Sequence, residues 1–250
     1  MFEDVCYKKS FLTEVVARID FVAPVTAFDK NISGKALKKI GSHFPIFEPR
    51  ESIAQHIEVG PDGGVKQKEL RGKQWNFFGR EREKQLIIEP GAIYVRYTKY
   101  SRFEDLKDEF QEAVNAIDQE ASGIVAQRFG LRYINQFDFE ELKLSNVNTY
   151  FTESLLGTVP FSGYARNLTR NFHIVELKFD EIDVRFQFGF PNTDYPAVMK
   201  RPTFVVDIDA YALTIHPITN SIQYIEAAHG HIQKLFEESV TNEMRSRMNG

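Results

Sequence analysis

The stretch FHIVELKFDEIDVRFQFGF, residues 172–190, decides the fold of this chain because it specifies a β-hairpin together with its register. If Asp180 and Glu181 form a two-residue turn, apolar residues face each other on one side of the hairpin and opposite charges face each other on the other side. The apolar pairs are Phe179 with Ile182, Leu177 with Val184 and Val175 with Phe186, and the charged pairs are Lys178 with Asp183 and Glu176 with Arg185. A slip of one residue would disrupt both patterns, so we predict an antiparallel hairpin in this register.

Further strands are expected on both sides of this hairpin, because apolar and polar residues alternate there or turn residues separate short apolar runs. They are predicted at residues 11–22, 83–89, 92–99, 129–137, 159–168 and 203–213. The irregular, proline-containing stretch 44–73 ends in a turn-rich sequence at residues 60–64 and is interpreted as a surface loop or a functional lid.

Two long helices are predicted from apolar residues at helical spacing, at residues 103–128 and 219–248. Ser101 and Glu104 match a capping box at the start of the first helix, and Phe110 lies on its apolar stripe, which should pack against the sheet of the first half. A short helix is expected at residues 34–41.

Together these elements predict an α+β protein with antiparallel sheets and two long helices. The order strand, helical or irregular insert, several strands and long helix occurs twice, so we expect two topologically similar β-α-β(3-4)-α halves. They would span residues 1–128 and 129–250, either as separate units or within one compact domain.

The composition excludes several functional classes. A net charge of −4 and a pI near 5.9 argue against a generally basic coat for nucleic acid or membranes, although local basic patches remain open. Cys6 is the single cysteine, which excludes an internal disulfide and a zinc site built on several thiolates. Neither a signal peptide nor a transmembrane segment is visible, so we expect a cytoplasmic protein that does not contact membranes.

Metal chemistry finds little support in the sequence, and no metal ion or other cofactor is expected. His229 and His231 are two residues apart on the predicted helix and point to different faces, so we expect His229 at the edge of the apolar stripe and His231 in solvent. Glu176 and Lys178 have the spacing of a nuclease motif but already have partners in the hairpin register.

Asp207 and Asp209 are the strongest carboxylate pair, because alternate residues of a strand point to one face. Their mutual repulsion requires a cation or a nearby arginine, and Arg185 could supply that charge if the strands are neighbours. A metal or ligand role for the pair therefore stays open beside an ion network.

Basic residues gather in two regions that could bind phosphate groups. The first cluster, between residues 66 and 84, is interleaved with aromatic residues but also with glutamates, which favours a solvated surface of mixed charge. Arg166 and Arg170 form the second cluster. Either could contribute to nucleic-acid binding.

The segment RFGLRYIN, residues 128–135, together with the early strand VARIDFVAP and the chain length, resembles a sporadically distributed prokaryotic family without an assigned activity. The resemblance implies no catalytic residues. A patchy distribution is typical of mobile genes, including phage-defence and toxin–antitoxin cassettes. Within the segment, Arg128 and Arg132 could bind an anion or pair with nearby acids, and Asn135 on the apolar side would require a hydrogen-bonding partner.

Three functional hypotheses follow. The first is a non-catalytic binding protein that recognises a protein partner, in a defence-type cassette, because no catalytic constellation is visible. The second is a ligand-binding module with an apolar cavity lined by Phe-rich strands. The third is a metal-dependent nuclease or hydrolase that uses Asp207, Asp209 and Glu176.

Overall fold

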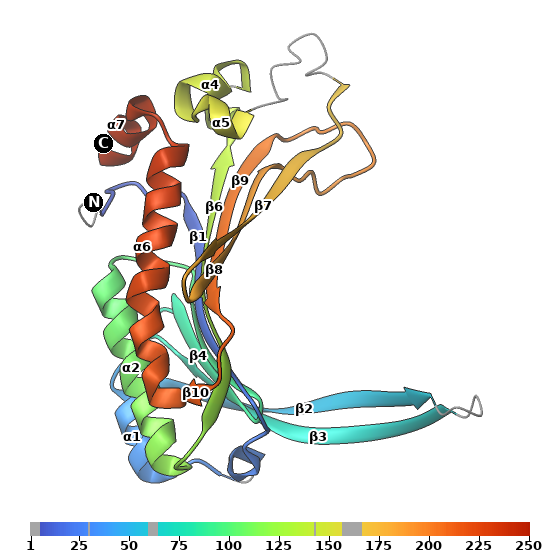
Figure 1. Cartoon of the computed structure of the whole chain (residues 1–250), viewed down its shortest axis with the longest axis vertical. Coiled ribbons are helices and arrows are strands. Elements are labelled where there is room, and N and C mark those ends of the chain that lie inside the picture. Colours follow the sequence, from blue (N-terminus) through green and yellow to red (C-terminus); the bar gives the residue numbers. More distant parts are fainter. Residues whose placement is uncertain (1–5, 30, 60–64, 143, 157–166) are drawn as a thin grey trace.

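The computed structural model describes residues 6–29, 31–59, 65–142, 144–156 and 167–250, whose strands form one antiparallel ten-stranded sheet (Figure 1). The strand order is β2-β3-β4-β5-β1-β6-β9-β8-β7, and β10 pairs with β6. The strands are β1 (Leu12–Phe21), β2 (Ile46–Val59), β3 (Val65–Phe78), β4 (Lys84–Glu89), β5 (Ala92–Tyr97), β6 (Val125–Asp138), β7 (Asn171–Phe179), β8 (Ile182–Phe190), β9 (Thr203–Ala212) and β10 (His216–Pro217). The predicted α+β class with an antiparallel sheet is confirmed.

The helices with at least two turns are α1 (Gly34–Gly41), α2 (Phe103–Glu120), α6 (Ile222–Ser239) and α7 (Asn242–Asn249). Shorter helical turns are η1 (Thr26–Asp29), α3 (Phe139–Leu142), η2 (Leu144–Asn146), α4 (Val147–Tyr150), α5 (Glu153–Leu156) and η4 (Ile218–Ser221). The long helices α2 and α6 lie side by side along one face of the curved sheet, and the opposite face carries neither of them (Figure 1). No helix among the described residues combines the length and apolar character that a membrane crossing requires.

The core lies between the sheet and its two long helices. On β1, the side chains of Val15, Ala17 and Ile19 are fully buried, whereas the residues between them are only partly buried. On α2, Leu106 and Phe110 are fully buried, as the helical spacing of the apolar residues predicts. The buried side chains of the strands and the apolar stripe of the helix therefore face each other across one interface.

The hairpin that decides the fold has the predicted register. Residues 171–179 pair with residues 182–190, and Glu176 lies opposite Arg185. The Nζ atom of Lys178 lies 3.0 Å from an Oδ atom of Asp183, and the Nε atom of Arg185 lies 4.0 Å from an Oε atom of Glu176. The charged residues of this hairpin thus form cross-strand ion pairs, as expected from the sequence.

The interpretation of residues 44–73 as a loop is wrong. Residues 46–59 and 65–73 belong to β2 and β3, which pair along their whole length and extend from the body of the sheet as a long arm (Figure 1). Pro49 is tolerated within β2 because β2 is the edge strand of the sheet, where a missing N–H need not break a ladder. The turn-rich residues 60–64 lie outside the described residues.

Both long helices end earlier than predicted. Helix α2 stops at Glu120, and Gly123 takes a φ of 82°, a left-handed conformation that glycine adopts without strain, before β6 begins at Val125. Ser101 does not cap α2, since its hydroxyl donates to Asp105 and the helix begins at Phe103.

The C-terminal helix is interrupted rather than continuous. Val240 is extended and forms a β-bridge with Phe151, and the hydroxyl of Thr241 then accepts a hydrogen bond from the backbone N–H of Met244 to cap α7. The apolar periodicity of this segment continues through the break, so periodicity alone could not reveal it.

The two predicted halves contribute neighbouring parts of the same sheet. In each half the first strand pairs with the last long strand, β1 with β5 and β6 with β9, and β1 and β6 pair with each other at the centre. The predicted boundary between residues 128 and 129 falls within β6, and the division into 1–128 and 129–250 stays a prediction. The expected strand at 159–168 falls mostly on residues that the structure does not describe.

Candidate functional site

A pocket of about 280 Å³ lies on the helical side of the sheet. Its walls come from the N-terminal segment before β1, the start of α2, the middle of β6, one face of α6 and the end of α7. The aromatic and apolar side chains that line it are Tyr7, Phe11, Leu12, Tyr100, Phe103, Tyr133, Ile232, Phe236 and Met248. A concave, mostly apolar cavity of this kind is typical of small-molecule sites.

Asn135 supplies a polar group within this apolar lining. The residue lies on β6, is only 5% exposed and borders the pocket. No hydrogen bond connects its side-chain amide to another described residue, and the amide is not among the fully buried polar atoms that lack a partner, so it is accessible from the pocket. Asn135 carries both donor and acceptor atoms, so it offers a hydrogen-bonding edge to whatever occupies the pocket.

Glu237 is a buried carboxylate at another side of the pocket, and its charge is balanced by the protein. The residue is 3% exposed, accepts a 2.7 Å hydrogen bond from the hydroxyl of Tyr7 and accepts a 2.8 Å hydrogen bond from Nε of Arg245. Burial and the bond to Glu237 raise the pKa of Tyr7, so this phenol stays protonated and donates. The hydrogen bond between Tyr7 and Glu237 connects the N-terminal segment to α6, and the contact of Glu237 with Arg245 connects α6 to α7.

His229 lies between aromatic rings at the wall of the pocket. Its imidazole stacks on the ring of Phe103 with centroids 3.8 Å apart, and its Nδ1 lies 3.2 Å from the hydroxyl of Tyr133. The hydroxyl of Tyr133 also lies 2.7 Å from that of Tyr100. The predicted place of His229 at the edge of the apolar stripe is confirmed.

The expectation that His231 is solvated is wrong. Its ring is partly buried and stacks on Phe179 of β7 with centroids 4.2 Å apart. Burial, together with the nearby charge of Lys234, lowers the pKa of this imidazole. His229 and His231 therefore pack against different aromatic residues, and no metal-binding cluster of histidine, cysteine or acidic residues occurs in the described part of the chain.

Asp207 lies on the open face of the sheet in a two-pronged contact with Arg132. Nε and one terminal nitrogen of Arg132 donate to its two carboxylate oxygens at 2.7 and 2.5 Å, and Gln187 donates to one of them at 3.3 Å. The Asp207 side chain is only 7% exposed. This geometry satisfies the carboxylate with protein donors alone.

Asp209 is held by the second arginine of the same strand, β6. A terminal nitrogen of Arg128 donates to Asp209 at 3.1 Å, and the guanidinium lies over the ring of Tyr211. Burial raises the pKa of Asp209, and the charges of Arg128 and Arg132 oppose this rise. Arg185 lies opposite Asp209 in the register of β8 and β9, as the sequence suggested, but its ion pair is with Glu176.

The predicted site residues thus separate into two places. Arg128, Arg132, Asp207 and Asp209 meet on the open face as two ion pairs. Arg170 lies before β7, where its guanidinium is over the ring of Tyr195 at 4.2 Å. Arg166 lies outside the described residues.

Replacing Asp207 and Asp209 together by asparagine should leave the affinities for Mg²⁺ and Mn²⁺ unchanged. It should lower the free energy of unfolding by about 1–3 kcal/mol, because charge-assisted hydrogen bonds are lost. Calorimetric titration and urea denaturation measure the two quantities. Glu176→Gln is the matched control, since the Glu176 side chain is 70% exposed and its loss should change stability by less than about 0.5 kcal/mol. Tight binding of either ion by the wild type that disappears in the double variant would restore the nuclease hypothesis.

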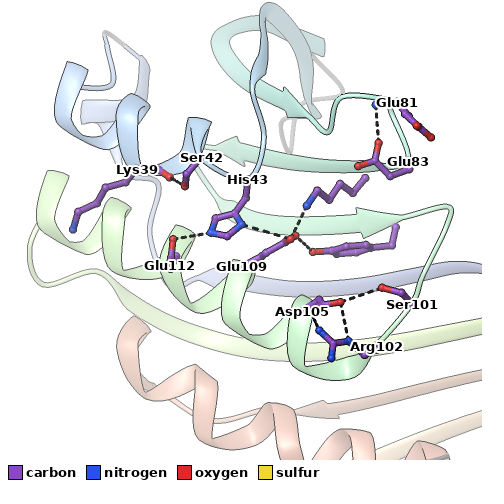
Figure 2. Close-up of polar contacts among 12 residues, drawn as sticks. Lys39, Ser42, His43, Glu81, Glu83, Ser101, Arg102, Asp105, Glu109 and Glu112 are labelled. Carbon is purple, nitrogen blue, oxygen red and sulfur yellow. Dashed lines mark hydrogen bonds and ion pairs between the residues drawn. The ribbon is translucent and has the colours of Figure 1, made fainter. Parts of the chain in front are cut away.

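A second polar cluster joins the segment that follows α1, the helix α2 and the sheet, and sequence reasoning missed it (Figure 2). Glu109 of α2 accepts hydrogen bonds from Nζ of Lys84 at 2.6 Å and from the hydroxyl of Tyr97, and its carboxylate lies 3.6 Å from Nδ1 of His43. His43 also contacts Glu112 at 3.0 Å. Burial and then the bond to Glu109 raise the pKa of Tyr97. These residues come from four separate segments, so no local pattern could indicate the cluster.

No protein-family model matches this chain, and no curated protein matches it either.

Proposed function

We propose that this protein is a non-catalytic binding protein whose pocket between β6, α2 and α6 takes a small molecule. The observation that carries the proposal is the amide of Asn135, which lies in the wall of an apolar cavity, is accessible from it and forms no hydrogen bond with a described residue. A few polar groups of this kind orient the ligand in a mostly apolar pocket. A bound molecule would pair with this amide.

The size and lining of the pocket agree with this function. A volume of about 280 Å³ is close to the lower end of the range of ligand pockets, and aromatic rings make up much of the wall. The carboxylates that first suggested hydrolase chemistry, Asp207 and Asp209, are engaged by Arg132 and Arg128 on the other face of the sheet. The geometry therefore favours binding over metal-dependent hydrolysis.

Recognition of a protein partner is the second candidate function, and the open face of the sheet favours it. That face carries no long helix and continues into the β2–β3 arm, so a partner could lie along the curve and against the arm (Figure 1). Arginine and tyrosine side chains are present there, as in Arg18 over Tyr94 and Arg128 over Tyr211. Both residue types are enriched at protein interfaces. Such a partner could belong to a phage-defence or toxin–antitoxin cassette.

Native mass spectrometry of the protein purified gently from its own source distinguishes the two candidates. Under the pocket proposal, the protein carries a small molecule that is lost in Gln233→Trp, because Gln233 borders the pocket and indole would fill it. Gln223→Trp is the matched control on the same helix, since Gln223 is exposed and does not border the pocket. Thermal melting verifies that both variants fold.

Two results would contradict the pocket proposal. One is a small molecule that stays bound to Gln233→Trp. The other is a bound protein, without any small molecule, that is released by Arg132→Glu on the open face. The second result would establish protein recognition instead.

A further inference from the structure

We infer that the ligand of the pocket is a neutral molecule with an aromatic body and an amide-type edge, in which a hydrogen-bond donor and an acceptor lie side by side. This inference rests on the proposed function, and it specifies which chemistry the pocket selects. The inference is carried by the nearly buried Asn135, whose amide is accessible from the pocket, by the aromatic residues of the wall and by the balanced charges of the lining.

The amide of Asn135 requires a ligand with two complementary atoms. Its Nδ2 group donates and its Oδ1 atom accepts, so a partner that offers only an acceptor or only a donor leaves one of them unpaired. Carboxamides, lactams and the edges of nitrogen heterocycles present both atoms at the required spacing. Paired recognition of this type is the way in which asparagine reads an adenine edge.

The aromatic and aliphatic residues of the lining indicate that the rest of the ligand is flat and apolar. The rings of Tyr133 and Phe103 and the side chain of Ile232 lie among the lining residues. Aromatic faces favour stacked or edge-to-face contacts with another ring, which add to the burial of apolar surface. An aromatic body uses this wall better than a flexible chain of similar volume, since a rigid ring loses less conformational entropy on binding.

The charges of the pocket argue for a neutral ligand. Glu237 is paired with Arg245 at 2.8 Å, and Arg102 at the rim is paired with Asp105 at 2.7 Å. Glu104 is the other charged residue of the lining, and it is exposed at the first turn of α2. An ionised ligand group would lose its hydration in this pocket without gaining a free opposite charge inside it.

Three probes of similar shape test the inference, namely benzamide, acetophenone and toluene, with dissociation constants from ligand-observed NMR titration. Benzamide offers a donor and an acceptor, acetophenone an acceptor alone and toluene neither. We expect the wild type to bind benzamide about tenfold more tightly than acetophenone, because benzamide can pair with both the donor and the acceptor of the Asn135 amide and acetophenone with the donor alone. Toluene should bind more weakly than benzamide.

Asn135→Leu removes the polar edge and keeps a side chain of similar size. In this variant the advantage of benzamide over acetophenone should disappear, and toluene should bind at least as tightly as benzamide. Gln233→Trp should weaken all three probes, because it obstructs the pocket without altering Asn135.

The outcomes separate this inference from the proposed function. If all three probes bind with equal affinity, or if Asn135→Leu keeps the preference for benzamide, the amide-type ligand is excluded while a small-molecule pocket stands. If no probe binds the wild type, or if Gln233→Trp binds them unchanged, the pocket proposal itself fails. If Asn135→Leu does not fold, the order of the three probes in the wild type decides the inference.

Discussion

Replacing Phe110 with alanine should lower the free energy of unfolding by about 3–5 kcal/mol, the usual loss when a fully buried phenylalanine becomes alanine. Phe110 is 0% exposed and lies on the face of α2 that packs against the sheet. The substitution removes the ring from the interface and leaves a cavity that the strands can only partly close. Urea denaturation followed by circular dichroism measures the loss.

A matched control separates this packing effect from the change in helix propensity. Asp108 lies two residues earlier on α2 and is exposed, so Asp108→Ala should change the free energy of unfolding by less than about 0.5 kcal/mol. A loss below about 1 kcal/mol for Phe110→Ala would show that α2 does not bury Phe110 in solution. Equal losses for the two variants would contradict the packing argument as well.

The hairpin of β7 and β8 shows which parts of the fold the sequence can predict. There, a two-residue turn, apolar pairs and charged pairs all require the same register, so a local pattern decides it. The β2–β3 arm lacks this agreement. Pro49 argues against a central strand, and only the position of β2 at the edge of the sheet, a property of the whole topology, makes it acceptable.

Helix ends were missed for a related reason. The apolar residues Ile124 and Val240 continue the helical spacing beyond the true ends of α2 and α6. What stops each helix is a non-helical backbone directly after its last residue, namely Ala121 with φ −137° and ψ 87° after α2, and the extended Val240, which forms a β-bridge with Phe151, after α6. Periodicity reports which residues are buried, and residues in a turn between two elements can be buried as well.

The candidate site was predictable only in fragments. The alternation of residues in β6 predicts that Asn135 lies on the apolar side, where its amide would require a hydrogen-bonding partner. The pocket proposal depends on this residue. Nothing in the sequence indicated that Tyr7, Phe103 and Phe236 would meet it there, because they come from segments far apart in the chain. For Asp207 and Asp209, the sequence shows that both side chains lie on one face of a strand. Their arginine partners could not be predicted, because they lie on β6, and the pairing of β6 with β9 is a property of the whole topology.

The polar cluster around Glu109 leads to the second large expected effect. The Glu109 side chain is 12% exposed and that of Lys84 is 15% exposed, so the ion pair between them is largely removed from water. Glu109→Leu would leave the Lys84 ammonium and the hydroxyl of Tyr97 without their acceptor. We expect the free energy of unfolding to fall by about 3–5 kcal/mol, as it does when one partner of a buried ion pair is removed.

Two comparisons determine whether this loss comes from the unpaired charge. Glu112 lies on the same helix, is 57% exposed and contacts His43, so Glu112→Leu should cost less than about 1 kcal/mol. The double variant Glu109→Leu with Lys84→Met removes both charges and should recover a large part of the lost stability, because an apolar pair of similar volume can replace a buried ion pair. Urea denaturation of the three variants measures these differences. If the double variant is no more stable than Glu109→Leu, the loss comes from packing around α2 rather than from the buried charge of Lys84.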